Sequence, residues 1–319
     1  MFRLGPGFIR PALAQHDTPE WHALCVCATL PSALRVIAIL GPNASVQDLE
    51  RFRVASESVE ITPAATISAP ADAALILGGD GTIHRHLPAL AETKIPTLIV
   101  PTGSGNDFAR ALGLAKMRFA AAAWRRFCSS GNNLRELDLG SIQPLSKDHD
   151  KAPLAPFSCI ASIGLDSEVN RIANGYPRWL RAHGGYLAAV PPALASFRPF
   201  HLTIRRDDGH DIHSEPATLC AFANASSYGD GMRIAPRAQL DDGLLDICFV
   251  RSVSKLRLLQ MFPSVYRGTH LRFREISYSQ TNRVEVTSDR PMDVYADGEF
   301  VCRTPVRISI MPKAMRVIC

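Results

Sequence analysis

Two glycine-rich loops, each placed directly after a short apolar run, constrain the fold of this chain more than any other feature. The run Ala73–Leu77 ends in the segment GGDGT at residues 78–82, and the run Thr97–Val100 ends in PTGSGN at residues 101–106. A stretch of helical character follows each loop; the two stretches are Ile83–Ala91 and Asp107–Leu112. Strand, glycine-rich loop and helix in repeated order predict a parallel α/β sheet with ligand-binding loops at the carboxyl ends of its strands.

The pattern of apolar runs changes along the chain and predicts two domains. A buried strand at Leu34–Leu40 and an alanine-rich helix near Phe119–Phe127 complete an α/β nucleotide-binding domain over residues 34–138. Short apolar runs alternate with turns over residues 139–304, which predicts a second, β-rich domain. Its expected strands are Phe157–Ile163, His201–Arg205, Thr218–Ala223, Leu244–Val250 and Val284–Thr287. A strand near residues 305–319 is a candidate to complete the first domain.

Composition indicates a globular protein with an ordinary core. The chain has 319 residues, of which 46% are hydrophobic and 20% charged, and its formal net charge is +5. These values exclude the disordered and fibrous classes, and no run approaches the roughly 18 apolar residues of a membrane-spanning helix. The mild positive charge favours anionic partners such as nucleotides or a membrane surface. Basic runs are not interleaved with aromatic residues, which argues against nucleic acid as a partner.

The N-terminal region and the cysteines favour a cytoplasmic protein. Residues 1–33 are predicted to form an irregular extension, because glycines and prolines interrupt the apolar run that a secretory signal requires. The eight cysteines are dispersed without metal-binding spacing, so reduced thiols are expected rather than a disulfide framework. The sequence leaves a homodimer open.

The residue types in the two loops suit phosphate binding. Without Cβ atoms, the glycines of residues 78–82 let backbone N–H groups approach a phosphate, and the following helix N-terminus adds partial positive charge. Asp80 can orient a ligand hydroxyl or, through water, Mg²⁺. Ser104 offers a hydroxyl, and Asn106 and Asp107 either cap the next helix or face the ligand. A plain strand-to-helix turn is the alternative for each loop, and neither loop matches the P-loop or the Rossmann fingerprint.

The same loops resemble the GGDGT and P-x-G-[TS]-x-N-D-F-[AG]-R signatures of the diacylglycerol kinase catalytic domain family, whose bacterial-type lipid kinases are related to sphingosine kinases and more distantly to NAD kinases. Further segments resemble family motifs in family order, so that the resemblance covers residues 75–300. These segments are Leu137–Gly140, Ile163–Val169, Tyr228–Ala238, Leu240–Asp246 and Tyr295–Glu299.

The resemblance implies an ATP- and Mg²⁺-dependent kinase that transfers the γ-phosphate to a lipid hydroxyl, with diacylglycerol as the default acceptor. It also implies an active site in the cleft between an N-terminal α/β domain and a C-terminal β-sandwich. The residues implied to bind the nucleotide are Gly78, Gly79, Asp80, Gly81, Thr82, Ile83, His84, Ser104 and Asn106. Those implied to bind Mg²⁺ are Asp242 and the main-chain carbonyls of Gln239 and Leu244. Asp80, Asp107 and Asp138 are implied to form a network with water and Mg²⁺.

The segment Asp297-Gly298-Glu299 carries the two carboxylates that the resemblance implies beside the acceptor hydroxyl. A carboxylate within hydrogen-bond reach assists an alcohol as nucleophile, typically by about 10²–10⁴-fold. The sequence does not decide which of the two is the general base. A simple Asp-Gly hairpin turn is the alternative.

Two regions depart from the family pattern. His84 and Arg85 stand where the family often carries Asn-Glu, and either alter nucleotide or acceptor binding or form a solvated helix start. The segment 41–45 only faintly resembles the family's N-terminal turn, and the interval from there to Gly78 is too short for the usual helices. No adenine contact is therefore assigned.

Other functions and a membrane contact remain open at this stage. An NAD kinase shares the GGDG loop but not the later motifs, and a catalytically weak nucleotide- or lipid-binding regulator is the alternative from another class. Besides the default diacylglycerol, the same family also allows a sphingoid base, a ceramide-like lipid or a polyprenol as the acceptor. One group of side chains forms either a lip for peripheral membrane association or ordinary packing. The group comprises Trp179, Leu180, Tyr186, Leu187 and Val190, with Arg171, Arg178 and Arg181 nearby.

Overall fold

The computed structural model describes residues 33–53, 59–68, 70–145, 153–177, 180, 185–229 and 231–319. The extension predicted for residues 1–33 lies outside these ranges except for Ala33. Within the described ranges, no helix combines the length and the apolar character needed to cross a membrane.

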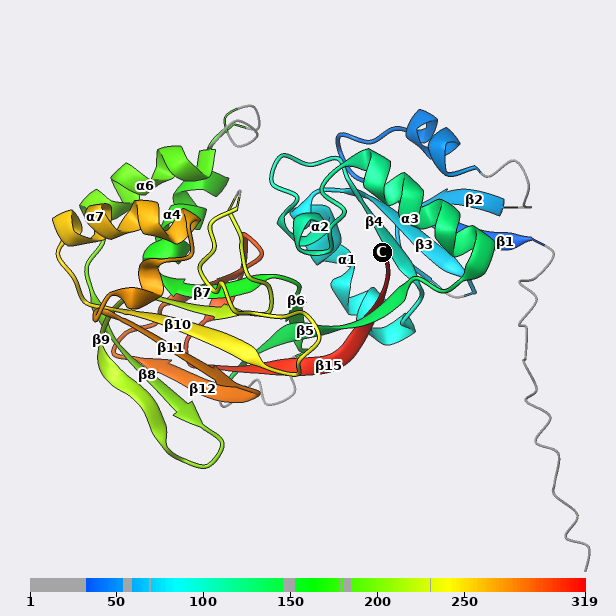
Figure 1. The fold of residues 1–319 in the computed structure, drawn as a ribbon. Coiled ribbons are helices and arrows are strands. Elements are labelled where there is room, and N and C mark those ends of the chain that lie inside the picture. The colour runs from blue at the N-terminus through cyan, green and yellow to red at the C-terminus, as the bar shows by residue number, and fades with distance from the viewer. Residues whose placement is uncertain are drawn as a thin grey trace, which may run out of the picture. The chain divides into compact units, whose positions relative to one another are not determined.

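A parallel sheet forms the N-terminal half, as predicted. Its strands, in spatial order, are β2 (Val59–Ala64), β1 (Leu34–Leu40), β3 (Ala73–Gly78) and β4 (Thr97–Pro101). β3 is buried at every position, which explains its continuous apolar sequence. The helices that follow β3 and β4 are α1 (Asp80–Thr93), α2 (Asp107–Ala111) and α3 (Met117–Ser130). Because β3 and β4 are neighbours, the two glycine-rich loops lie side by side at their carboxyl ends (Figure 1).

Two elements between β1 and β3 were not predicted. The 3-10 helix η1 (Val46–Phe52) buries Leu49 and Phe52, and β2 pairs in parallel with β1 at the edge of the sheet. β2 has no fully buried position and contains Pro63, so its sequence lacks the apolar run of a central strand. The short interval before Gly78 therefore holds one 3-10 helix and one strand.

Two long antiparallel strands run through both halves of the described chain. β5 (Leu134–Pro144) and β15 (Val306–Ile318) pair along their whole length, with a register shift between Met311 and Met315. β15 also pairs with β4 through Val317 and with β12 (Arg283–Ser288) near its own start. The last strand of the chain thereby joins the parallel sheet to the antiparallel strands.

The C-terminal half is antiparallel and β-rich, and the predicted fold class is confirmed. Besides β12 it contains β6 (Ala155–Phe157), β7 (Ile160–Gly164), β8 (Phe200–Arg206), β9 (Asp211–Ala223), β10 (Leu245–Arg251), β11 (Ile276–Thr281), β13 (Asp293–Ala296) and β14 (Glu299–Arg303). Its core consists mainly of buried isoleucine, leucine, valine and phenylalanine side chains from these strands.

Among the described residues of this half, three α-helices were not predicted. They are α4 (Leu165–Asn174), α6 (Gly185–Ser196) and α7 (Lys255–Tyr266), labelled together in Figure 1. α6 contains Pro191 and Pro192, and internal prolines remove helix hydrogen bonds. Its buried Ala189 and Ala193 pack in one cluster with side chains of α4, and Leu258 of α7 packs against that cluster. Tertiary packing therefore stabilises a helix that its local sequence disfavours.

Gly140 provides a test of the packing between β5 and β6. A Cβ atom at residue 140 would lie 2.0 Å from Cζ of Phe157, whose ring covers the glycine. We expect Gly140→Ala to lower the free energy of unfolding by about 1–3 kcal/mol, because the ring must move within a packed core. Urea unfolding measures the change. The control Gly175→Ala, whose Cβ would lie 3.3 Å from the Ile172 carbonyl oxygen, is expected to change it by less than about 0.5 kcal/mol. Equal losses would contradict this account.

Candidate active site

The two glycine-rich loops touch each other through glycines. A Cβ at Gly103 would lie 2.5 Å from the Cα atom of Gly79, so neither position leaves space for a side chain. Asn106, in the left-handed region at φ 53°, accepts the N–H of Gly103 at 2.9 Å and donates to its carbonyl at 2.6 Å. The side chain of Asn106 therefore closes the turn of its own loop and makes no capping hydrogen bond to α2.

Asp80 connects the first loop to the second. It is the first residue of α1, and its two carboxylate oxygens accept the N–H groups of Asp107 and Phe108, each at 3.1 Å. It thereby satisfies the amino-terminal N–H groups of α2 from a different loop. Asp107 in turn accepts hydrogen bonds from Arg110 and, at 3.2 Å, from the N–H of Gly231.

The carboxylates of Asp80 and Asp107 lie close together. A single point, the Cβ position built on Gly105, lies 3.1 Å from Asp80 Oδ2 and 3.6 Å from Asp107 Oδ2. Burial and then the charge of Asp107 raise the pKa of Asp80 to about 6. A cation beside this pair would relieve the repulsion, and an all-oxygen donor set suits Mg²⁺.

Asp138 lies elsewhere, in β5, where it contacts the loop that carries Asp242. It is buried, and its two oxygens accept the N–H of Gly243 at 2.7 Å and that of Lys313 at 2.8 Å. The carboxylate of Asp242 accepts the N–H of Leu244 at 3.0 Å. Over the described ranges, no group of three or more His, Cys, Asp or Glu side chains is arranged to hold a metal ion. A magnesium ion here would therefore take one carboxylate, carbonyl oxygens and water, which is common for this cation.

The segment Asp297-Gly298-Glu299 forms the tight hairpin turn between β13 and β14. Asp297 and Gly298 both have positive φ, at 49° and 86°, as the favoured two-residue hairpin turn requires. The segment therefore contains an Asp-Gly hairpin turn, and this turn places the two carboxylates in different surroundings. Glu299 is exposed, and its Oε1 lies 3.2 Å from the Cβ position built on Gly81.

The carboxylate of Asp297 is buried and surrounded by donors. Its side chain is only 1% exposed. The donors are the backbone N–H groups of Ser158, Cys159 and Ile160, the Ser158 hydroxyl and the ring of His84. Although burial raises the pKa of Asp297, the hydrogen bond and charge of His84 and the backbone donors outweigh burial and lower it.

His84 links α1 to this turn. Its Nδ1 lies 3.3 Å from Asp297 Oδ2, and its side chain is 18% exposed. Burial lowers the pKa of His84, but the hydrogen bond to Asp297 and the charges of Asp297 and Glu299 outweigh it and raise the pKa. His84, which departs from the family pattern, thus contacts the turn that carries Asp297 and Glu299.

The remaining residues predicted to bind the nucleotide lie in different surroundings. Ser104 is exposed in the second loop, whereas the side chain of Ile83 is fully buried in the core and could offer a nucleotide only its backbone. Thr82 packs against two glycines: its Oγ1 lies 2.8 Å from the Cβ positions built on Gly41 and on Gly78. The loop after β1 therefore contacts the first glycine-rich loop.

Several residues that hold the site were missed from the sequence. Asn224 is fully buried and donates to the carbonyls of Asp138 and Ser158, each at 2.9 Å. Asn174 of α4 donates to the Gly298 carbonyl at 2.9 Å. No local signal distinguishes these asparagines from loop residues, because their partners are remote in the sequence.

Comparison with known proteins identifies both halves of the chain. The model of the diacylglycerol kinase catalytic domain matches residues 33–142, and that of the YegS C-terminal NAD kinase beta sandwich-like domain matches residues 159–319. A diacylglycerol kinase of Mycobacterium tuberculosis strain H37Rv is 36% identical over 261 residues, which cover 80% of this chain and 79% of the relative.

Solved structures agree on the fold. One described as a diacylglycerol kinase from Bacillus anthracis superposes with a TM-score of 0.62 at 20% identity, covering 89% of this chain and 96% of the other. An NAD kinase from Archaeoglobus fulgidus in complex with ATP gives a TM-score of 0.50 at 14% identity, with coverages of 90% and 94%. From the family match and the mycobacterial relative together, the chain belongs to the diacylglycerol kinase catalytic domain family.

Proposed function

We propose that this protein is an ATP- and Mg²⁺-dependent lipid kinase that transfers the γ-phosphate of ATP to the hydroxyl of a lipid, with diacylglycerol as the first candidate acceptor. The observation that carries the proposal is the approach of Glu299 to Gly81, with Glu299 Oε1 3.2 Å from the Cβ position of that glycine. This approach places an exposed carboxylate beside the first glycine-rich loop, which is suited to phosphate binding. Phosphoryl transfer needs mainly such alignment and charge stabilisation.

The two loops supply the donor side of the reaction. The backbone N–H groups of residues 78–82, at the start of α1, would hold the phosphates of ATP, and the exposed Ser104 would add a hydroxyl. The contact between Gly79 and Gly103 supports this role, because no side chain at these two positions stands between the loops. Mg²⁺ would be held by Asp242 with the carbonyls of Gln239 and Leu244, and through water by Asp80, Asp107 and Asp138; when bound, it neutralises phosphate charge.

Glu299 is the better candidate for the general base. A base needs a free lone pair aimed at the acceptor hydroxyl. Both oxygens of Asp297 already accept hydrogen bonds from the backbone of residues 158–160, and its side chain is buried. We therefore assign Asp297 to holding the turn and Glu299 to accepting the hydroxyl proton.

The first experiment is radiolabelled phosphate transfer from Mg²⁺·ATP to a panel of acceptors in detergent micelles. The panel comprises diacylglycerol, a sphingoid base, a ceramide, a polyprenol and NAD. Label on a lipid supports the proposal and names the acceptor; label on NAD would replace it with an NAD kinase. ATP binding without transfer to any acceptor would favour a nucleotide-binding regulator. We also propose that the protein is cytoplasmic and acts at the membrane surface. Co-sedimentation with vesicles tests the membrane contact.

The two carboxylates of the turn are expected to behave differently when substituted. Glu299→Gln should lower kcat by about 10²–10⁴-fold with little change in stability, because it removes a proton acceptor from an exposed position. Asp297→Asn should lower the free energy of unfolding by about 1–3 kcal/mol, because an amide nitrogen replaces an oxygen that accepts N–H groups. Initial rates and urea unfolding measure the two effects. A Glu299→Gln enzyme of normal rate would contradict the assignment.

Magnesium should stabilise the protein through Asp242. At a tenfold excess of Mg²⁺ over its dissociation constant, the free energy of unfolding should rise by about 1.4 kcal/mol. Asp242→Asn should abolish the gain, although asparagine can still accept the N–H of Leu244. Thermal unfolding with MgCl₂, against NaCl of equal ionic strength, is the measurement. Asp208→Asn, at an exposed residue, is the control and should respond like the wild type.

His84 should make stability depend on pH. Because its pKa is raised on folding, its contribution is complete below the unfolded pKa of about 6.5 and is lost as pH rises through the folded pKa. His84→Asn keeps an N–H near the Nδ1 position but cannot be charged. We therefore compare the free energy of unfolding of the wild type with that of His84→Asn. The advantage of the wild type should be larger at about pH 6 than at about pH 8.5, by roughly 0.5–1.5 kcal/mol. Urea unfolding at both pH values measures this, and an excess that grew with pH would refute it.

A further inference from the structure

Asn224 joins two segments of the candidate site through a single buried amide. It follows directly after β9, and its side chain is fully buried. The amide nitrogen donates to the carbonyls of Asp138 and Ser158, each at 2.9 Å. Two acceptors around the nitrogen fix which way the amide is turned, because the amide oxygen has no hydrogen to donate. One side chain therefore connects β5 to the segment that leads into β7.

A break in the pairing of β5 with β15 makes the carbonyl of Asp138 available to Asn224. The register of the two strands shifts between Met311 and Met315, and Asp138 lies in the interval that this shift leaves unpaired. Its backbone groups have other partners instead. The N–H donates to the Leu240 carbonyl at 2.7 Å, and the carbonyl accepts the amide of Asn224.

Asp138 in this way holds both sides of the loop at residues 239–244, which we propose to bind Mg²⁺. Besides the bond to the Leu240 carbonyl, its carboxylate accepts the N–H of Gly243 at 2.7 Å. Leu240 and Gly243 lie on either side of Asp242 in the sequence. The placement of Asp242 therefore depends on Asp138.

The other acceptor of Asn224 belongs to the segment that holds Asp297. The N–H and the hydroxyl of Ser158 donate to the Asp297 carboxylate at 2.7 and 3.0 Å. The N–H of Cys159 donates to it at 2.8 Å, and the Cys159 carbonyl accepts the backbone N–H of Asn224, also at 2.8 Å. Asn224 thus supports residues 158–160 from one side while they hold Asp297 from the other. The position of Glu299, two residues further on, depends on this support.

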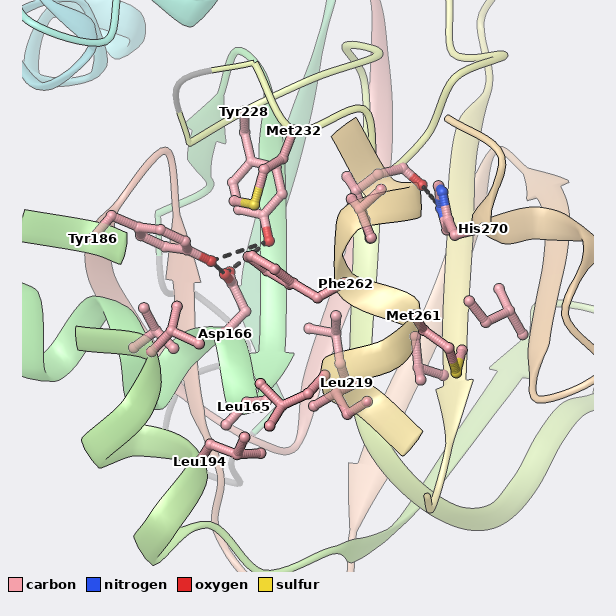
Figure 2. A pocket seen from close by; sticks show the side chains of 18 residues that line it. Leu165, Asp166, Tyr186, Leu194, Leu219, Tyr228, Met232, Met261, Phe262 and His270 are labelled. Carbon is pink, nitrogen blue, oxygen red and sulfur yellow. Dashed lines mark hydrogen bonds between the residues drawn. The ribbon is translucent and has the colours of Figure 1, made fainter. Parts of the chain in front are cut away.

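Helix α4 supports the same turn without using the loop at residues 239–244. Asn174 donates to the carbonyl of residue 298 at 2.9 Å. At the start of the helix, Asp166 accepts hydrogen bonds from the hydroxyls of Tyr186 and Tyr228, the latter at 2.7 Å (Figure 2). Trp179, Arg178 and Arg181, which the sequence groups with Tyr186, lie outside the described residues. Because of α4, we expect the turn at residues 297–299 to form even when Asn224 is replaced.

We propose that Asn224 is a positioning residue that couples Mg²⁺ binding in the loop at residues 239–244 to the placement of Glu299. Its amide joins Asp138, which holds the loop, to residues 158–160, which hold the turn. Hydrogen bonds in such a buried network support one another, so ordering one end restricts the other. The inference rests on the proposed function for the role of Glu299 and for Mg²⁺ at this loop.

The first test measures hydrogen exchange with and without Mg²⁺, in the absence of substrates. In the wild type, MgCl₂ should slow exchange at residues 239–244 and also at residues 158–160 and 297–299, relative to NaCl of equal ionic strength. Asn224→Ser offers one hydroxyl donor in place of two N–H donors. It should keep the slowing at residues 239–244 and lose it at residues 158–160. Slowing confined to residues 239–244 in the wild type, no slowing at all, or equal slowing in both proteins would overturn the coupling.

Asn133 provides a matched control. It is also buried, and its amide nitrogen donates to the Ala123 carbonyl of α3 at 2.9 Å. As in Asn224, the amide oxygen is buried and has no hydrogen-bond partner among the described residues. Its backbone carbonyl accepts the N–H of Cys319. Asn133→Ser should therefore destabilise the protein much as Asn224→Ser does, yet respond to Mg²⁺ at residues 158–160 like the wild type.

The second test asks whether Asn224 acts through Glu299. At saturating Mg²⁺, Asn224→Ser should lower kcat by about 10–100-fold and keep KM for ATP within about twofold, since a misplacement of about 1 Å can cost 10²-fold. In a Glu299→Gln background the same change should lower kcat by less than about twofold, because the group that Asn224 positions is already lost. Asn133→Ser should leave kcat as in the wild type. Equal losses in both backgrounds would contradict the proposal. Asn224→Asp, which keeps the shape of the side chain, is used if the serine variant does not fold.

The two tests separate this inference from the proposed function. Lipid phosphorylation with a normal kcat in Asn224→Ser would refute the positioning role and leave the kinase intact. Slowed exchange at residues 158–160 that Asn224→Ser abolishes, with no lipid phosphorylated, would retain the coupling and refute the kinase.

Discussion

The buried carboxylate of Asp297 is the interaction on which the arrangement of the candidate site depends. It accepts backbone N–H groups from Ser158 to Ile160 and contacts His84, so one side chain joins the turn of β13 and β14, the start of β7 and helix α1. A charge in such a position is costly unless hydrogen bonds and an opposite charge satisfy it. Here both are present. Glu299 follows two residues later, so its position beside Gly81 depends on how Asp297 is held.

The acidic residues of the chain divide between support and chemistry according to what surrounds them. Asp138 and Asp297 are satisfied mainly by backbone N–H groups and hold loops in place. Asp80 also accepts backbone N–H groups, but it lies beside Asp107, whose charge adds to burial in raising the pKa of Asp80. Glu299 alone among these is exposed. The division explains why residues of one chemical type, grouped by family motifs, need not share one role.

Helix α4 connects a buried polar cluster to the turn of Asp297 and Glu299. Asp166, Asn170 and Asn174 recur every four residues, so they share one face of the helix. Asp166 accepts hydrogen bonds from the hydroxyls of Tyr186 and Tyr228 at one end of this face, and Asn174 donates to the Gly298 carbonyl at the other. One helix face therefore joins the buried tyrosines to the turn that carries Glu299.

The sequence by itself determined the parallel strands, the two glycine-rich loops and the β-rich character of the second half, because these depend on local apolar runs and on glycine's lack of a side chain. It also pointed to Asp297-Gly298-Glu299 as a unit, but not to the separate environments of its two carboxylates, which the contact with residues 158–160 decides. β2, α6 and α7 were missed, since an edge strand and proline-containing helices carry weak local signals and form through their neighbours. The roles of Asn224 and Asn174 were beyond reach for the same physical reason: each depends on a partner far away along the chain, Asp138 for Asn224 and Gly298 for Asn174, and the partners meet only in the folded protein.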